Sequence, residues 1–296
     1  MWKWIAGGIL LAVAVALPVL LTEQALGMPS ERTEPDRTKA EAIAAATGTT
    51  WTEAEIATTD GAKLKGWVFL PAAGRDSGKA IILLHGAGDS RKGMLGFSRF
   101  FAQRGYSTLA VDSRGHGVSG GPMVTYGLLE RQDVHQWADY LLGLRPKAKL
   151  YGLGMSMGAA VLIQALDTEP RFRSIAAECS YSTFRAAASE RIPRLTGLPA
   201  FFSRPVVSAA FLYAQLRYGY DLEAISPVDS LKRTHTPVLL IHGLDDGRTA
   251  PEQSRELHAA NPGVSELWEV PGAKHVQASV VAQQEFEERV QRWFDK

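Results

Sequence analysis

Ser156 lies in a glycine-flanked pentapeptide, Gly154-x-Ser156-x-Gly158, whose residue types could present a nucleophilic hydroxyl. Residues 148–151 before it predict a short strand, and residues 159–166 after it predict an apolar helix. Glycines two positions before and after the serine remove side chains where strand and helix crowd together, so the hydroxyl can project above a sheet. A serine hydroxyl is a weak nucleophile by itself. The chemistry therefore needs a base, an acid that orients the base, and N–H donors for an oxyanion.

A second copy of this pattern shows how little it means without its context. Residues 117–121 also fit it, around Ser119, but they lie in a glycine-rich run closed by Pro122. No helix can start directly after a serine in that position. We therefore predict that Ser119 lies in a loop and is not the nucleophile.

The base and the acid are expected on two later loops. Residues 271–275 follow the last predicted strand, which places His275 at the carboxyl edge of the sheet. Asp245 and Asp246 follow the predicted strand at 237–241, and adjacent residues point in different directions, so at most one of them can orient a histidine. The chain order serine, aspartate, histidine, with each residue on a loop after its own strand, is a known order of a catalytic triad.

Two turns after neighbouring predicted strands complete the expected site. A glycine-flanked turn around Ala87 can aim its N–H at the space above the serine, and the N–H of Met157 would supply the second oxyanion donor. We expect His85, at the end of the preceding strand, to be structural, because such a histidine usually fixes a loop by hydrogen bonding. Asp112 and Arg114 follow the next strand and suit a turn braced by a salt bridge between them.

Alternating strands and helices must position these residues. Repeated β-then-α units imply a mainly parallel sheet with helices on both faces. Asp60 and Gly61 predict the turn of a hairpin at its start. The expected strands are at 53–58, 64–70, 80–84, 107–111, 148–151, 174–178, 237–241 and 266–270, and the expected helices are at 93–104, 128–144, 159–166, 252–260 and 276–294.

Residues 182–235 interrupt this alternation. A coil of that length is unusual, so we predict an inserted lid of short helices over the site. The insert is rich in aromatic side chains, which would either line an apolar pocket or fasten the lid to the domain. The aromatic residues are Phe184, Phe201, Phe202, Phe211, Tyr213, Tyr218 and Tyr220, and the aliphatic Leu212 lies among them.

These motifs resemble those of the serine α/β-hydrolases over residues 51–296. The resemblance implies an α/β-hydrolase fold, a mainly parallel sheet flanked by helices with a helical lid, and an acid three residues after His-Gly, at Asp246 rather than Asp245. Two further motifs resemble a bacterial, membrane-associated branch with a small helical cap, related to the serine aminopeptidase-like group. The family motifs are the elbow, His85-Gly86-x-Gly88, Asp112-x-Arg114-Gly115-His116-Gly117-x-Ser119, His242-Gly243-x-x-Asp246 and Gly272-x-x-His275, and those of the branch are Glu178-Cys179-Ser180-Tyr181-Ser182 and Ile225-Ser226-Pro227.

Composition limits the other classes of function. With 296 residues and 46% hydrophobic content, the chain suits one large α/β domain or two small ones. The 32 basic residues balance 31 acidic ones, so the composition provides no large net positive charge that would favour binding of nucleic acid. Cys179 is the one cysteine, which excludes an internal disulfide framework and a Cys-rich metal site. The expected chemistry needs no metal or organic cofactor, and the sequence has no Walker or dinucleotide phosphate loop.

An apolar segment opens the chain. After Lys3, residues 5–21 carry no charge, a length at the lower limit for spanning a bilayer and slightly long for a signal peptide. Trp2 and Trp4 favour a retained anchor, whereas residues 25–27 offer a small-residue cleavage site. We therefore expect a membrane anchor or a signal peptide.

The expected organisation has three parts. Residues 1–27 are the anchor or signal peptide, residues 28–50 are a polar spacer, and residues 51–296 are the hydrolase domain. With Lys3 on the cytoplasmic side, the catalytic domain would lie outside the cytoplasm, either membrane-anchored or secreted.

The expected reaction is acyl transfer to water through Ser156. An acyl ester or thioester is the leading substrate because an apolar lid would lie beside a membrane segment, and a peptide or amide is the second. Two other classes stay open: a catalytically silent domain that binds a lipid or a partner protein, and an acyltransferase that uses the same serine.

Overall fold

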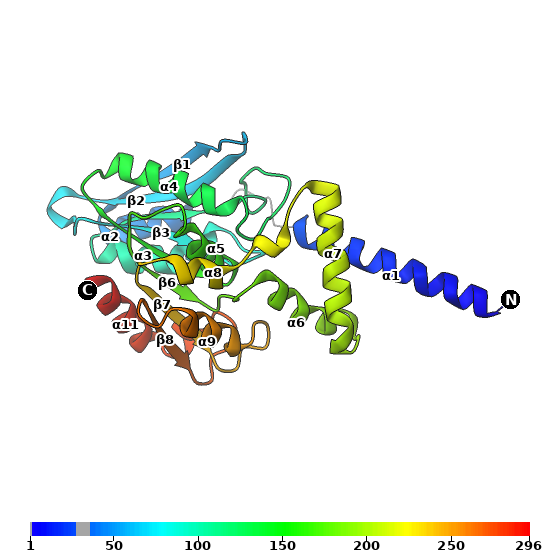
Figure 1. Ribbon diagram of the computed structural model, residues 1–296. Helices are drawn as coiled ribbons and strands as arrows, with labels where there is room; N and C mark the ends of the chain where they lie inside the picture. Colours follow the sequence, from blue (N-terminus) through cyan, green and yellow to red (C-terminus); the bar gives the residue numbers. More distant parts are fainter. Residues whose placement is uncertain (1, 28–35) are drawn as a thin grey trace.

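Eight strands form one twisted sheet that runs from the β1–β2 hairpin at one edge to β8 at the other (Figure 1). The strands are β1 (Thr49–Ala57), β2 (Lys63–Pro71), β3 (Lys79–Leu84), β4 (Ser107–Val111), β5 (Lys149–Met155), β6 (Phe172–Glu178), β7 (Val238–Gly243) and β8 (Ser265–Val270). Their order is β1-β2-β4-β3-β5-β6-β7-β8, and all neighbours from β4 to β8 are parallel. This computed structural model describes residues 2–27 and 36–296, with side chains of the first helix from residue 14 onward.

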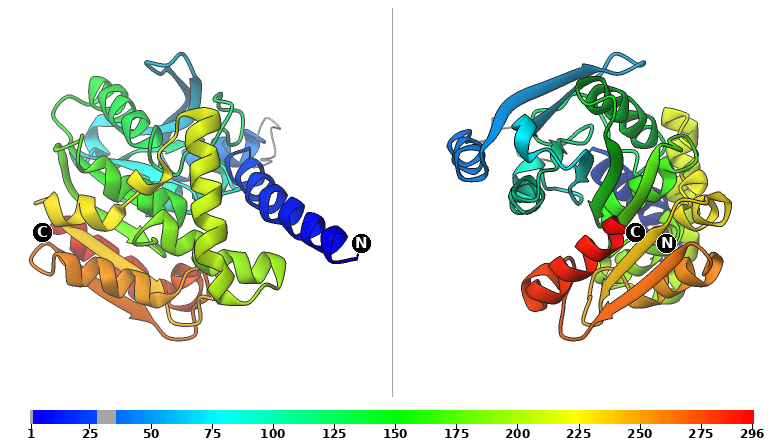
Figure 2. Two further views of the ribbon diagram at one scale, coloured as in Figure 1. Left: turned by 45° about the vertical axis from the view of Figure 1, so that its right-hand side comes forward. Right: turned by 90° about the vertical axis from the view of Figure 1, so that its left-hand side faces the viewer.

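Helices cover both faces of the sheet (Figure 2). One face packs against α3 and α11, and the other packs against α4, α5, α8 and α9. The mainly parallel, two-sided architecture expected from the sequence is confirmed. The helices are α1 (Trp2–Leu26), α2 (Thr38–Thr47), α3 (Leu95–Gln103), α4 (Glu130–Leu144), α5 (Met157–Ala165), α6 (Phe184–Thr196), α7 (Ser203–Tyr218), α8 (Pro227–Arg233), α9 (Pro251–Ala260), α10 (Ala278–Val281) and α11 (Gln283–Asp295).

The central strand β3 shows why the sheet forms. Its apolar run is buried on both faces: Ile82 and Leu84 belong to one core cluster, and Ile81 and Leu83 belong to the other. Successive side chains of a strand point to opposite faces, so an uninterrupted apolar run fits a strand covered on both sides. Fully burying each such side chain contributes roughly 1.5–3 kcal/mol.

Strand β1 begins at Thr49, four residues before its expected start, and two further elements differ from the expectation. The strand before Ser156 extends to Met155, where the sequence predicted an end near Tyr151, because Gly152 and Gly154 pair with β3 on one side and β6 on the other. Pairing with two neighbours overrides the weak strand preference of glycine. The closing helix expected over 276–294 breaks at Ala282, whose φ of −128° and ψ of 51° separate α10 from α11.

The insert between β6 and β7 is helical, as expected. Helices α6 and α7, with a short turn of 3₁₀-helix between them, form the part we call the cap, whereas α8 packs against α5 and α9 beside the sheet. The ring of Phe184 lies 4.4 Å from that of Tyr126 and 5.7 Å from that of Phe211. Phe184 therefore fastens the cap to the domain and also joins α6 to α7, while Phe201 is 73% exposed.

Helix α1 packs its carboxyl-terminal part against α7 of the cap. Pro18, Thr22 and Leu26 are buried and lie four residues apart, so they share one helix face. The Thr22 hydroxyl also donates to the carbonyl of Ala210 on α7, at 3.2 Å. Among the helical residues whose side chains the structure describes, no helix is both long and apolar enough to cross a membrane.

Part of the expected spacer belongs to the fold. Residues 28–35 lie outside the described residues, as do the side chains of Trp2 and Trp4. From Thr38 onward the chain forms α2, whose Ala40 and Ala44 pack against Trp67 of β2. The stretch between α1 and β1 is thus in contact with the sheet over its second half.

Candidate active site

Ser156 lies on the sharp turn between β5 and α5, with a φ of 53° and a ψ of −115°. The flanking glycines permit this turn, because a Cβ atom on Gly154 would lie 2.4 Å from the carbonyl oxygen of Gly158. A Cβ atom on Gly158 would lie 2.4 Å from the carbonyl oxygen of Leu84 in β3. Strand, serine turn and helix therefore have the geometry of a nucleophile elbow.

The structure brings Ser156, His275 and Asp246 together in one chain of hydrogen bonds. His275 Nδ1 lies 2.7 Å from Asp246 Oδ2, and His275 Nε2 lies 2.8 Å from Ser156 Oγ. Because a carboxylate can only accept, Nδ1 carries the proton and Nε2 accepts from the serine hydroxyl. Asp245 is exposed and takes no part in this chain.

The carboxylate of Asp246 is held in its charged form. Its Oδ1 accepts from the N–H groups of Arg248 at 2.8 Å and Thr249 at 3.0 Å. Burial alone would raise the pKa of Asp246, but hydrogen bonds from His242, His275 and the Thr249 N–H outweigh burial and hold it well below its usual range. An ionised Asp246 can orient His275 and stabilise its protonated form.

A second histidine, His242, lies next to Asp246. His242 is fully buried, and its Nε2 lies 3.0 Å from the Thr249 carbonyl oxygen and 3.3 Å from Asp246 Oδ2, so its N–H is shared between these two acceptors. Its Nδ1 therefore accepts from the Ser254 hydroxyl at 2.6 Å. Donor atoms of Cys179, His242 and Asp246 lie within 4.8 Å of one another. Both nitrogens of His242 are engaged and burial raises the pKa of the Cys179 thiol, so this cluster is better suited to bracing Asp246 than to binding a metal.

Glu178 is a residue of this site that the sequence did not predict. Its backbone carbonyl accepts from the Ser156 N–H at 2.7 Å, and its Oε1 accepts from the N–H of Ala278, three residues after His275, at 2.9 Å. Its Oε2 is buried without a hydrogen-bond partner among the described residues. Burial raises the pKa of Glu178 to about 7. Its place at the end of β6, in the motif that resembles the membrane-associated branch, was the available signal.

The two predicted oxyanion donors lie beside the serine. Met157 is the first residue of α5, where a helix leaves its N–H groups without an intrahelical partner. Ala87 lies in an exposed turn whose neighbour Gly86 approaches Ser156 so closely that a Cβ there would be 3.4 Å from the serine Cβ. The Ala87 and Met157 N–H groups stay the predicted oxyanion donors.

His85 and Ser119 have structural partners. His85 Nδ1 donates to the carbonyl of Gly86 at 2.7 Å, and its Nε2 accepts from the Ser113 N–H at 3.1 Å, as expected of a histidine that fixes a loop. Ser119 lies in a loop, also as predicted. Its hydroxyl donates to the Asp112 carbonyl at 2.7 Å and accepts from the Lys65 N–H at 2.8 Å.

The predicted salt bridge between Asp112 and Arg114 is wrong. Asp112 instead accepts from the backbone N–H of Arg91 at 2.7 Å and faces its guanidinium at 3.6 Å. The guanidinium of Arg114 binds Asp133 on α4 and Asp60 in the hairpin turn. Sequence proximity favoured the local pair, whereas side chains on a tight turn point apart and meet charges from distant segments.

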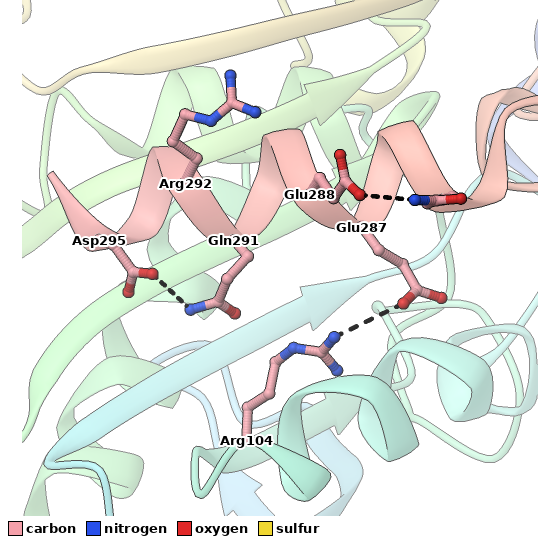
Figure 3. A pocket seen from close by; sticks show the side chains of 7 residues that line it. Arg104, Glu287, Glu288, Gln291, Arg292 and Asp295 are labelled. Carbon is pink, nitrogen blue, oxygen red and sulfur yellow. Dashed lines mark hydrogen bonds and ion pairs between the residues drawn. The ribbon is translucent and has the colours of Figure 1, made fainter.

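A large polar groove lies away from this site. Figure 3 shows its lining on α11, with Arg104 at the end of α3, and its volume is about 590 Å³. An ion pair between Arg104 and Glu287, at 3.6 Å, crosses it. None of its lining residues belongs to the loops around Ser156, so this groove is not where an acyl group would meet the serine.

Comparisons with known proteins identify the family and support the fold. Residues 81–289 match the model of the Alpha/beta hydrolase family. Uncharacterized protein YqkD of Bacillus subtilis is 26% identical over 238 residues, which cover 79% of this chain and 76% of that protein. The Pyrococcus furiosus esterase Pf2001 has a TM-score of 0.71 at 26% identity, covering 90% of this chain and 98% of that chain. For the Pyrococcus horikoshii acylaminoacyl peptidase the TM-score is 0.63 at 19% identity, covering 83% and 41%, a likeness of fold alone.

Proposed function

Because this chain belongs to the Alpha/beta hydrolase family, we propose that it is a serine hydrolase that cleaves a carboxylic ester through an acyl-enzyme on Ser156. Hydrolysis is the chemistry of the family, and the esterase neighbour supports an ester as the substrate. The observation that supports this activity most is the unbroken hydrogen-bonded chain from Ser156 through His275 to Asp246.

The reaction would proceed in two halves. Ser156 Oγ attacks the carbonyl carbon while His275 Nε2 takes its proton, and the N–H groups of Ala87 and Met157 hold the resulting oxyanion. The bond to the leaving oxygen then breaks, and His275 returns the proton so that an alcohol departs. Water repeats these steps on the acyl-enzyme and releases the acid. Asp246 stays ionised throughout and stabilises the protonated His275.

An ester of an apolar acid is the substrate class we favour. The ring of Phe184 packs on Tyr126 and holds the cap to the domain, and the carboxyl-terminal part of α1 packs against α7. A peptide bond is the second possibility, since the same triad can cleave an amide. The acylaminoacyl peptidase neighbour does not decide between them, because at 19% identity it shares the fold alone.

The nucleophile can be tested by intact-mass analysis of the full chain after exposure to a fluorophosphonate. We expect one adduct that Ser156→Ala abolishes and Ser119→Ala, in the loop copy of the motif, retains. With p-nitrophenyl esters of increasing acyl length, Ser156→Ala should lower kcat by roughly 10⁴-fold or more. Melting temperatures of both variants show whether they are folded.

Three outcomes would contradict this function. A folded wild-type protein without an adduct would favour a silent binding domain. Faster turnover of peptide amides than of esters would favour a peptidase. Acyl transfer to an added alcohol in preference to water would favour an acyltransferase.

We also propose that the uncharged residues 5–21 hold the protein at a membrane with the hydrolase domain outside the cytoplasm. The sequence of this segment supports the proposal. Protease added to intact spheroplasts should then degrade the domain, and a domain protected until the cells are lysed would contradict it.

A further inference from the structure

Large apolar side chains are exposed on the cap. Phe201 is 73% exposed and Leu216 is 78% exposed, in a chain whose apolar side chains are otherwise mostly buried. Phe201 and Phe202 are neighbours whose ring centroids lie 4.2 Å apart, and an exposed apolar patch of this kind can mark an interaction site. The residues that we call the cap surface are Leu195, Phe201, Phe202, Leu212 and Leu216.

The cap surface does not arise from a poorly covered core. Helix α7 already packs an apolar face inward, through Val207, Phe211 and Ala214. Leu212 and Leu216 lie one turn apart on its solvent side. Helix α7 therefore presents two large apolar side chains to solvent in addition to its buried apolar face.

Positive charge surrounds the cap surface. Arg191, Arg204 and Arg217 are exposed, and none forms an ion pair with a carboxylate among the described residues. Between Phe184 and Tyr218 the one acidic residue is Glu190, which is bound to the N–H of Ala250. Glu23 of α1 adds a carboxylate that accepts from Tyr213 and Tyr218 and interacts electrostatically with Arg217. Exposed aromatic groups with arginines around them fit an apolar layer covered by anions.

Helix α1 leaves the molecule on the side of α6 and α7 in both Figure 1 and Figure 2. Its face against the cap starts at Pro18, so residues 2–17 extend beyond that contact. Sixteen helical residues reach about 24 Å, less than the roughly 30 Å hydrocarbon core of a bilayer. A helix this short, entering a bilayer, would bring the cap that holds it to the headgroup layer.

We propose that the cap surface lies on an anionic lipid bilayer, with Phe201 and Phe202 in the interface and the neighbouring arginines at the lipid phosphates. A second copy of the chain is a poorer occupant, because a two-fold contact would bring Arg204 and Arg217 near their own equivalents. This docking is independent of the chemistry at Ser156. A measurement of where the cap surface lies, rather than of substrate turnover, therefore tests the docking separately from the proposed hydrolase activity.

The test uses the full chain carrying Phe201→Cys labelled with an environment-sensitive nitrobenzoxadiazole. The native Cys179 is fully buried and will not compete for the label. On phosphatidylglycerol vesicles we expect a blue shift, an increase of about two-fold in emission and loss of iodide quenching. Glu288→Cys on the exposed side of α11 is the matched control and should show none of these changes. Adding Arg204→Glu and Arg217→Glu should reduce the response at residue 201.

Two results would overturn the proposal. One is a protein that floats with the vesicles while iodide still quenches the label at residue 201, because α1 alone would then hold the protein at the membrane. The other is a spectral change that appears without vesicles when the protein concentration rises, which would identify a second copy as the occupant.

Discussion

Ser156 has a backbone conformation that non-glycine residues rarely adopt, at a cost of roughly 1–3 kcal/mol. Its neighbours hold it there, since the Ser156 N–H donates to the Glu178 carbonyl at 2.7 Å. The side chain of Glu178 binds the Ala278 N–H beyond His275, so one residue connects the segments of the nucleophile and the base. Its second oxygen, buried without a partner among the described residues, favours the protonated acid.

Glu178→Gln should change how stability depends on pH. Burial raises the pKa of Glu178 to about 7, above the unfolded value near 4.5, so the native state binds this proton more tightly. Wild-type stability should therefore fall as pH rises from about 4.5 to 7. At pH 5 the two proteins should unfold alike in urea. At pH 8 the variant should be more stable, by on the order of 2 kcal/mol. Equal pH dependence of the two would show that Glu178 does not titrate in this range.

At the scale of elements, the cap is connected to the loop that carries Asp246. Glu190 on α6 accepts from the Ala250 N–H at 3.1 Å and from the Gln253 side chain at 2.7 Å. Arg194, one turn later, donates to the Arg248 carbonyl at 2.6 Å. These contacts reach the loop that also donates two N–H groups to Asp246, so the position of α6 and the orientation of the acid are coupled.

Glu190→Ala should lower kcat/KM for an ester by about ten-fold, because the loop after β7 loses its contact with α6 and orients Asp246 less well. Hydrogen exchange of residues 247–250 should become faster in the same variant. Glu223→Ala is the matched control, since Glu223 pairs with Arg185 of the cap and has no described contact with that loop. If both variants lose activity equally, general loosening of the cap is the cause.

At the scale of the whole molecule, the amino-terminal helix is part of the folded unit. Tyr213 and Tyr218 of α7 both donate to Glu23, at 2.7 and 2.5 Å. The carbonyl of Leu26 accepts from the Val124 N–H at 2.8 Å, which connects α1 to the loop before α4. Leu26 itself is 1% exposed, so the end of α1 packs as a core element does.

Leu26→Ser should detach the end of α1, because it removes buried apolar contact and adds a hydroxyl to an apolar site. Amide hydrogen exchange over residues 18–27 should become roughly 100-fold faster. Leu20→Ser, on the exposed side of the same helix at 65%, should leave exchange unchanged. Equal exchange in the two variants would show that α1 is not docked in solution.

The sequence alone predicts the position of a residue when the role of that residue depends only on its own segment of the chain. Glycines around Ser156 and a histidine on the loop after the last strand are local features, and chain order then set them along one edge of a parallel sheet. The choice of Asp246 over Asp245 followed from the resemblance to the family. The alternating elements followed from apolar periodicity, which encodes which faces of each segment are buried. The fold and the three residues that meet at its edge were therefore within reach of the sequence.

The sequence by itself thus determined the architecture and the location of the candidate triad, because periodicity, glycine sterics and chain order act within a segment or between neighbours. Only the tertiary structure decided which charges pair, as with Arg114 and Asp133, and that Glu178 carries a buried, unpartnered oxygen beside the nucleophile. It also decided that α1 packs on the cap. These features depend on how segments far apart in the chain pack against one another, and a local pattern of residues carries no information about that packing.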